Sequence, residues 1–186
     1  MAINKKIVLG SGKLYATVFD GETIPENTTL EVDTNLLGLI SGGATLTYEP
    51  EYYTASDDLG IAVKKMITTE TVTLTSGIMT WNGATLAKLV NTGRVDETKA
   101  GKRTVKIGGV GNYDGKQYVL RFVHEDAAEG DIRITIVGAN EAGFEMAFTK
   151  DEETVIDAEF TAFPLDDDGT LIIYEEEDAT VAGAGA

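Results

Sequence analysis

The sequence predicts a mainly β fold: a β-sandwich or split barrel of two packed antiparallel sheets with one short flanking α-helix. Three observations predict it. Apolar and polar residues alternate in runs rich in Thr, Val, Ile, Tyr and Phe, which is the period of a half-buried strand. Clusters of Gly, Asn and Asp interrupt these runs, as turns do. One stretch places its apolar residues at helical spacing.

The length and composition suit one domain. A chain of 186 residues, of which 42% are hydrophobic, can bury a core of ordinary size. We expect the domain to cover residues 1–175, with long loops at 20–33, 54–60 and 92–115. Residues 176–186 are acidic or rich in Ala and Gly and cannot support a core, so we expect a flexible tail there.

The alternation predicts roughly ten strands. Those in the first two thirds of the chain are expected at 13–19, 44–53, 61–66, 70–81, 104–107 and 117–124. In the last third, large apolar residues alternate over 132–137 and 144–149, so we expect two neighbouring half-buried strands. A further strand at 155–163 has one apolar face and one acidic face, which carries Asp157 and Glu159.

One short helix is expected, lying on a sheet. Asn82 is a suitable N-cap, and Leu86, Leu89 and Val90 follow the spacing of a single apolar helix face. Gly93 can close the helix.

The segment 160–174 has the pattern of a strand, an acidic turn and a second strand, which together would form a hairpin. Asp166, Asp167 and Asp168 are consecutive, so their carboxylates point in different directions, and the alternating spacing and distal Glu of a calcium loop are missing. We therefore expect a turn in which Gly169 takes a positive φ.

The charge balance is strongly acidic. The 15 basic residues against 31 acidic ones leave a formal net charge of −16. Proteins bind a phosphate backbone by replacing its counterions with Lys and Arg, so this balance opposes adhesion to nucleic acid. Like charges repel within about 8 to 10 Å at moderate salt, so such a surface can lie beside a polyanion without adhering to it.

The chain contains no cysteine, which excludes a disulfide, a thiolate nucleophile and a zinc–thiolate site. After the basic N-terminus, the apolar run of residues 7–9 ends at Gly10, far short of a signal core or a membrane span. We therefore expect a soluble protein that is made and kept in the cytosol, with no membrane partner.

We expect no enzyme, since no catalytic, cofactor-binding or metal-binding set can be assembled. His124 is the only histidine and has no recognisable nucleophile as a partner, so a structural role is expected. Segment 108–117 is rich in Gly, but a P-loop needs Gly where this chain has Val110, and Ser or Thr where it has Gln117. A hairpin turn at 112–116 is expected instead.

Four aromatic residues suggest a carbohydrate-binding platform: Tyr48, Tyr52, Tyr53 and Trp81. Aromatic residues in strands more often pack across strands, and Trp81 directly precedes the expected helix, where it would fill the seam between helix and sheet. We expect packing roles, with a monomeric β-sandwich that binds carbohydrate or protein as the alternative of another class.

Several segments resemble, in pattern and order, the major tail tube proteins of long-tailed bacteriophages. They are residues 43–50, 54–60, 70–75, 81–83, 117–125, 131–137 and 160–174. The resemblance covers roughly residues 30–175 and includes no catalytic motif.

This resemblance implies a structural virion protein of the tail, synthesised and assembled in the host cytoplasm. Its subunits would form hexameric rings that stack into a hollow tube, the conduit for DNA ejection. The partners implied are further copies of the chain, the tail tip or baseplate initiator, the tape measure protein and the tail terminator, with DNA passing without adhesion. The inner tube of a contractile tail or of a related injection apparatus is the alternative.

Three hypotheses follow about surfaces. We expect part of the acidic surplus to line the lumen, with Asp157 and Glu159 as candidates; an outer position is equally consistent with the alternation. A basic cluster is expected either to dock on an acidic turn of a neighbouring subunit, such as the one at residues 166–168, or to be a solvated loop. Its members are Arg94, Lys99, Lys102, Arg103 and Lys106. Segments 20–33 and 54–60, with few apolar anchors, are expected to become ordered only between rings.

Overall fold

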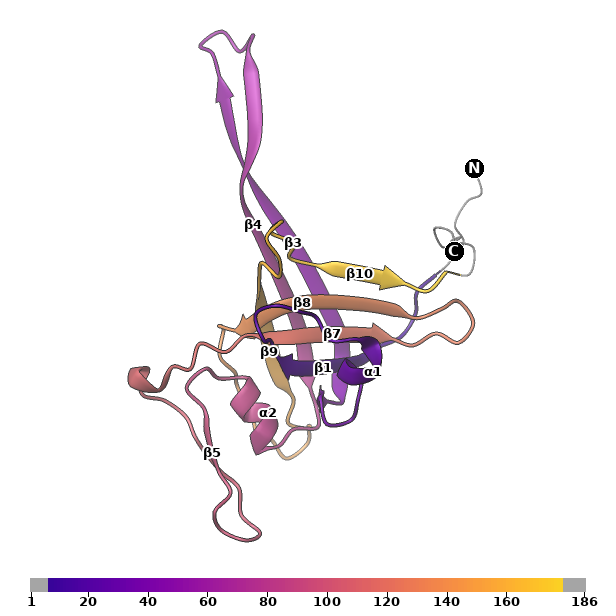
Figure 1. Ribbon diagram of the computed structural model, residues 1–186, viewed down its shortest axis with the longest axis vertical. Coiled ribbons are helices and arrows are strands. Elements are labelled where there is room, and N and C mark those ends of the chain that lie inside the picture. The colour runs from indigo at the N-terminus through magenta and orange to yellow at the C-terminus, as the bar shows by residue number, and fades with distance from the viewer. Residues whose placement is uncertain (1–6, 179–186) are drawn as a thin grey trace.

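The computed structural model describes residues 7–178 and is mainly β, as predicted (Figure 1). Its strands are β1 (Lys13–Val18), β2 (Leu36–Gly38), β3 (Ile40–Ser56), β4 (Val63–Ile78), β5 (Arg94–Asp96), β6 (Thr104–Lys106), β7 (Tyr118–His124), β8 (Ile132–Asn140), β9 (Ile156–Phe163) and β10 (Ile173–Glu176). Its helices are α1 (Asn27–Leu30), α2 (Gly83–Lys88) and the 3₁₀ turn η1 (Val110–Asn112).

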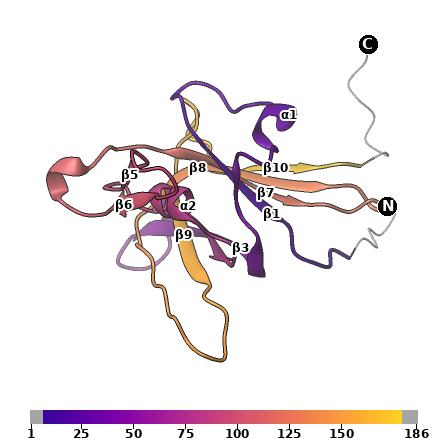
Figure 2. The same cartoon turned by 90° about the horizontal axis from the view of Figure 1, so that it is seen from below.

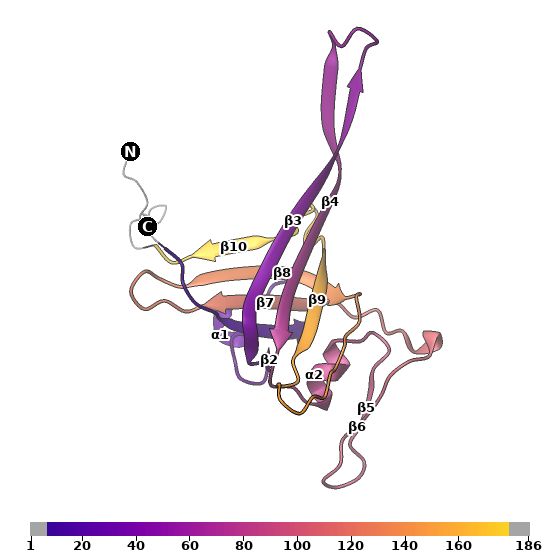
Figure 3. The ribbon, with the colours of Figure 1, turned by 180° about the vertical axis from the view of Figure 1, so that it is seen from behind.

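Most strands belong to one eight-stranded antiparallel sheet in the order β2-β1-β7-β8-β9-β4-β3, with β10 also paired to β8. A small second sheet consists of β5 and β6. Strand β9 joins the two halves of the large sheet, because it pairs with β4 from Ile156 to Thr161 and with β8 from Phe160 to Phe163. Figure 3 shows the result: β3, β4 and β9 cross β1, β7 and β8 at a steep angle. Over the described residues the sheet folds onto itself without closing into a barrel.

The main core lies between these two halves. Its fully buried residues alternate along the strands of both halves, as the period of two requires. They include Leu14, Val72, Leu74, Ile78, Leu120, Ile136, Ile156 and Phe160. At the junction of β8 and β9 the backbones approach closely, since a Cβ on Gly138 would lie 2.3 Å from the Thr161 carbonyl oxygen. Only glycine fits there.

The opposite face of β7 and β8 is covered by the segment that contains α1. Leu30 is wholly buried in a second cluster with Val119 and Val137. Segment 20–33, which was expected to hold few apolar anchors, has one in Leu30, and the rest of the segment is mostly exposed.

The helix prediction is confirmed at its start. The Asn82 side chain accepts hydrogen bonds from the backbone N–H groups of Ala84 and Thr85, and the Thr85 hydroxyl completes a capping box. Leu89, directly after α2, is fully buried. The Lys88 ammonium donates to the Ala16 carbonyl oxygen at 2.7 Å and ties the helix to β1, and burial lowers the Lys88 pKa.

Two predicted strands are in fact one. Residues 61–66 and 70–81 were expected as separate strands after a polar loop, but β4 is continuous and pairs with β3 almost to its tip. A β-bulge at Thr68, the one residue between Ile67 and Thr69 that has no partner on β3, accommodates the break in the alternation of apolar and polar residues. The outer half of this hairpin, residues 51–71, projects beyond the body of the protein (Figures 1 and 3), and we call it the arm.

The region before β9 corrects another prediction. Residues 144–149 were expected to form a strand, but residues 141–155 are an irregular loop that extends away from the sheet (Figure 2, orange). Phe144 and Met146 still pack against the core, whereas Phe148 is 75% exposed and meets Trp81 edge to face. Apolar and polar residues do alternate over 144–149, but β8, the neighbour expected for this strand, already pairs with β7 on one edge and with β9 and β10 on the other.

Two predicted hairpins are not formed. Strands β9 and β10 do not pair with each other; they run in the same direction and occupy successive stretches of the same β8 edge. Residues 112–116 connect β6 to β7 without being a hairpin turn, because β6 pairs with β5. The expected tail also begins later, since Glu176 belongs to β10 and Glu177 is hydrogen-bonded; residues 179–186 lie outside the described residues.

Phe160 connects the two halves of the core, so its loss should be costly. We expect Phe160→Ala to lower the free energy of unfolding by about 3 to 5 kcal/mol, because it removes a wholly buried side chain and leaves a cavity. Glu159→Ala, on the exposed face of the same strand, should leave it nearly unchanged. Chemical denaturation of both variants checks this, and equal losses would contradict the assignment of the two faces.

Candidate interaction surfaces

The outer side of β3, β4 and β9 is a continuous polar face. Paired residues of antiparallel strands lie on the same face of a sheet, and the register brings threonines and carboxylates together here. The face consists of Thr45, Thr47, Glu49, Thr71, Thr73, Thr75, Asp157, Glu159 and Thr161. None of these nine positions holds Lys or Arg, so the polar face is acidic without local compensation.

Asp157 and Glu159 are exposed on the polar face, as alternation along β9 predicted. Glu159 lies opposite Thr75, and Asp157 lies opposite Gly77. The outer edge of β3 has no strand partner among residues 7–178. The face therefore ends at a long open strand edge, which is a template for pairing with another chain unless something covers it.

The arm carries large apolar side chains that the rest of the chain does not cover. Every residue from 51 to 71 is exposed. Its large hydrophobic residues are Tyr52, Tyr53, Leu59, Ile61, Val63, Met66 and Ile67, each between 45% and 82% exposed. A two-stranded hairpin alone is marginal in water, and a large exposed apolar surface is typical of an interaction site, so the arm is a candidate interaction surface.

The arm tyrosines do not form a flat platform. Tyr52 and Tyr53 are consecutive, so their side chains point to opposite faces of the strand. The Lys65 ammonium lies 4.1 Å from the centre of the Tyr52 ring, and the Tyr48 hydroxyl donates to Glu70. These are the cross-strand contacts that the sequence predicted.

The tip of the arm is acidic and apolar. The Asp57 carboxylate accepts a hydrogen bond from the Ala62 backbone N–H at 2.7 Å, which lowers the Asp57 pKa and shapes the turn. Asp58 forms no hydrogen bond or ion pair with any described residue. Leu59 and Ile61, at 79% and 82% exposed, flank these carboxylates.

The predicted basic cluster lies on the hairpin of β5 and β6, residues 94–106, which we call the basic hairpin. It projects at the end of the molecule opposite the arm (Figure 1), and α2 packs beside it. Arg103 is held by Glu97 and Asn82, and Arg94 donates to the Gly108 carbonyl oxygen. The Lys99 and Lys102 ammonium groups have no such partner among the described residues.

The acidic turn at residues 166–168 is confirmed as a turn. Gly169 has φ +78° and donates its N–H to the Asp166 carbonyl oxygen. Hydrogen bonds from Thr170 lower the Asp166 pKa. Asp167 and Asp168 are exposed. The turn leads from β9 to β10 and is in the body of the protein rather than at its tip (Figure 3).

A buried ionic cluster was missed by the sequence analysis. Arg133 donates to Glu31 at 2.8 Å and to Glu177 at 2.7 Å, and these bonds raise the Arg133 pKa further above its usual value. Arg121, 3% exposed, donates to Thr135 at 2.9 Å and also contacts Glu31 and Asn27. The cluster fastens α1 and the chain beyond β10 to the central strands.

His124 is buried, which agrees with a structural role. With a proton on Nδ1, the ring donates to the Ser11 carbonyl oxygen at 2.8 Å and holds the segment before β1. Its Nε2 is buried and has no hydrogen-bond partner.

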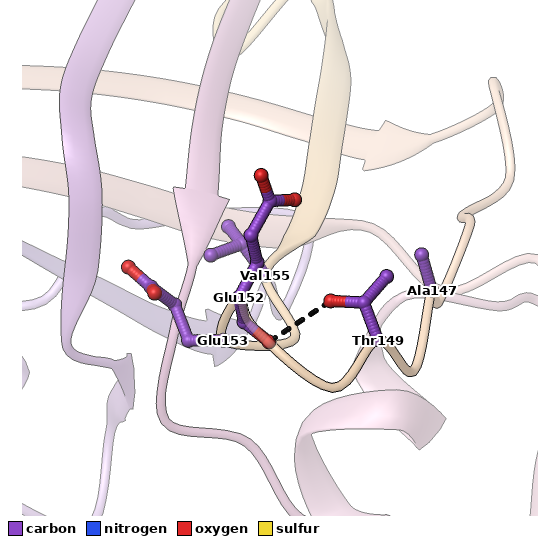
Figure 4. A pocket seen from close by; sticks show the side chains of 5 residues that line it. All are labelled: Ala147, Thr149, Glu152, Glu153 and Val155. Atoms are coloured by element: carbon purple, nitrogen blue, oxygen red, sulfur yellow. Dashed lines mark hydrogen bonds between the residues drawn. The ribbon is translucent and has the colours of Figure 1, made fainter.

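Several hollows lie on the surface of the described part of the chain. Figure 4 shows one in the loop before β9, where the Thr149 hydroxyl donates to the Glu152 carbonyl oxygen at 3.2 Å. The residues that line this hollow are Ala147, Thr149, Glu152, Glu153 and Val155, and they include no His, Lys or Arg. Within residues 7–178, no three His, Cys, Asp or Glu side chains are placed to hold a metal ion.

The sequence matches no protein-family model and no curated protein sequence. No helix in the described part of the chain is long and apolar enough to cross a membrane. Function must therefore be inferred from the surfaces themselves.

The ionic cluster yields a stability prediction. Arg121→Ala should lower the free energy of unfolding by on the order of 3 kcal/mol, because it removes a buried side chain together with its hydrogen bonds to Thr135 and Asn27. Lys13→Ala breaks an exposed pair with Glu125 and should have little effect. Thermal and urea unfolding would measure both, and the idea fails if the two variants are equally stable.

Proposed function

We propose that this protein is the subunit of a phage tail tube, a structural virion protein that polymerises as stacked hexameric rings. The observation that supports this best is the arm, whose apolar side chains are uncovered in the single chain. An exposed apolar surface of this kind is characteristic of a protein–protein interface. The hexamer and the tail location come from the family resemblance alone.

The open edge of β3 supports the same proposal. Pairing of this edge with a strand of a neighbouring copy extends the sheet from subunit to subunit and removes the edge from solvent. Repetition of such a contact around an axis closes a ring. The polar face then curves with the sheet and can line a bore.

The polar face is suited to a passage for DNA. It offers hydroxyls and carboxylates and no cation at its nine positions, so it repels phosphate and gives DNA no site of adhesion. In this proposal Asp157 and Glu159 face the lumen. A tail tip initiator, a tape measure protein and a terminator are the partners that the resemblance implies.

The other assignments have less support. An inner tube of a contractile tail or injection apparatus would use the same surfaces, and nothing in them favours it. For a carbohydrate-binding module the expected aromatic platform is divided between opposite faces of the arm, and Trp81 is half-buried against Phe148.

Polymerisation is the direct test. The concentrated wild-type protein, alone or with a tail tip nucleus, should form hollow rods or rings in negative-stain electron microscopy. A chain that stays monomeric at every concentration, even beside the nucleus, contradicts the proposed function.

The arm provides a sharper version. Leu59→Ser with Ile61→Ser should raise the concentration needed for assembly by about a hundredfold, since burial of two aliphatic side chains contributes roughly 3 kcal/mol. The melting temperature of the monomer should not change, because both side chains are exposed. Val18→Ser, at a 54% exposed valine outside the arm, is the control, and sedimentation would measure assembly.

The lumen assignment can be tested separately with Glu159→Cys, since the chain has no other cysteine. A bulky maleimide-polyethylene glycol should label the monomer quickly and the assembled tube slowly, whereas a small maleimide should label both. Equal labelling of tube and monomer by the bulky reagent would place Glu159 on the outside. A neutral or basic bore in a tube reconstruction would refute the acidic lumen.

A further inference from the structure

We propose that the arm tip of one copy docks on the basic hairpin of the next copy along the tube axis. This inference rests on the proposed function and names the partner surface within it. The arm and the basic hairpin project at opposite ends of the longest axis of the molecule (Figure 1). When copies are aligned along this axis, the upper end of one meets the lower end of the next, which is a heterologous contact that repeats without closing.

Charge complementarity supports the pairing. Residues 94–106 hold five basic side chains against two acidic ones, which is a third of the 15 basic residues of a chain with net charge −16. The arm tip presents Asp57 and Asp58. The arm also carries two lysines: Lys65 lies over the Tyr52 ring, and Lys64 is exposed opposite Ala55. The Asp58 carboxylate and the Lys99 and Lys102 ammonium groups, which have no partner among residues 7–178, are complementary in charge.

Apolar surface is also present at both ends. Leu59 and Ile61 are exposed at the arm tip. On the basic hairpin and directly after it, Val95 and Ile107 are exposed, at 44% and 47%. An apolar centre with charged residues at its rim is the usual anatomy of an interface, in which the charges fix orientation more than they add affinity.

The acidic turn at residues 166–168 is the competing receptor for the basic hairpin. Asp166 is already occupied by hydrogen bonds from Thr170, and the turn has no comparable exposed apolar residue beside its carboxylates. It also lies in the body of the protein and not at the pole (Figure 3). The arm tip is thus the better match.

Cross-linking between two single-cysteine proteins tests the contact without background, because the wild-type chain has no cysteine. Asp58→Cys and Lys102→Cys proteins are mixed under assembly conditions and oxidised. A disulfide-linked dimer of the two is expected, since a disulfide needs Cβ atoms about 4 Å apart. The matched controls pair Lys102→Cys with Asp168→Cys, and Asp58→Cys with Lys150→Cys.

Charge reversal provides a second readout. Lys99→Glu with Lys102→Glu should raise the concentration needed for assembly by about tenfold, and adding Asp58→Lys to the same chain should restore it. Lys150→Glu, at an exposed lysine of another loop, is the control and should have no such effect. Circular dichroism confirms that each variant is folded.

The outcomes separate the two proposals. Tubes that form without the Asp58–Lys102 cross-link, or with a cross-link to Asp168→Cys in its place, overturn the docking inference and leave the proposed function standing. A cross-link between copies that never build tubes supports the docking contact and contradicts the tube. Absence of both tubes and cross-link overturns both.

Discussion

The fold depends on the double pairing of β9. This strand satisfies the backbone of β4 along its first part and that of β8 along its last part, so a single strand belongs to both halves of the sheet. The change of partner at Phe160 forces the sheet to bend, and the bend encloses the core. Because β9 pairs only with residues 137–140 of β8, the same edge of β8 is open to β10 at residues 132–135. The bend also directs β3 and β4 out of the body of the protein. The arm, the polar face and the open edge all follow from this geometry.

Local pattern was sufficient to predict the elements whose residues contact solvent on one side and the core on the other. The alternation along β9 placed Phe160 inward and Glu159 outward, and the Asn82 cap marked the start of α2. The same pattern misled at residues 144–149, where apolar side chains pack on the core from an irregular backbone. Alternation reports which side chains are buried, not which backbone groups have a strand available to pair with.

The candidate surfaces were predictable to different degrees. The exposed carboxylates of β9 and the density of cations at 94–106 are local features, and sequence alone revealed them. The threonines that complete the polar face come from β3 and β4, and their place depends on register between strands. The Arg133–Glu31 contact joins residues about a hundred positions apart, and no local sequence pattern predicts such a pair. The arm was not predicted as one hairpin because residues 54–60 were expected as a loop and residues 61–66 as a separate strand, whereas β3 and β4 pair as far as Ser56 and Val63.

The uneven placement of cations has a consequence for how copies meet. Outside the basic hairpin, Arg121, Arg133 and Lys88 form internal bonds, and Lys13 and Lys116 each pair with a nearby carboxylate. Five basic residues against two acidic ones are therefore gathered at one end of the long axis of a chain whose net charge is −16. Two copies that approach side by side bring like charges together and repel each other, whereas an end-on approach places the basic hairpin of one copy near the acidic surface of the other and is favoured. Added salt would screen these charges and weaken the preference for end-on approach at concentrations that leave the fold unchanged.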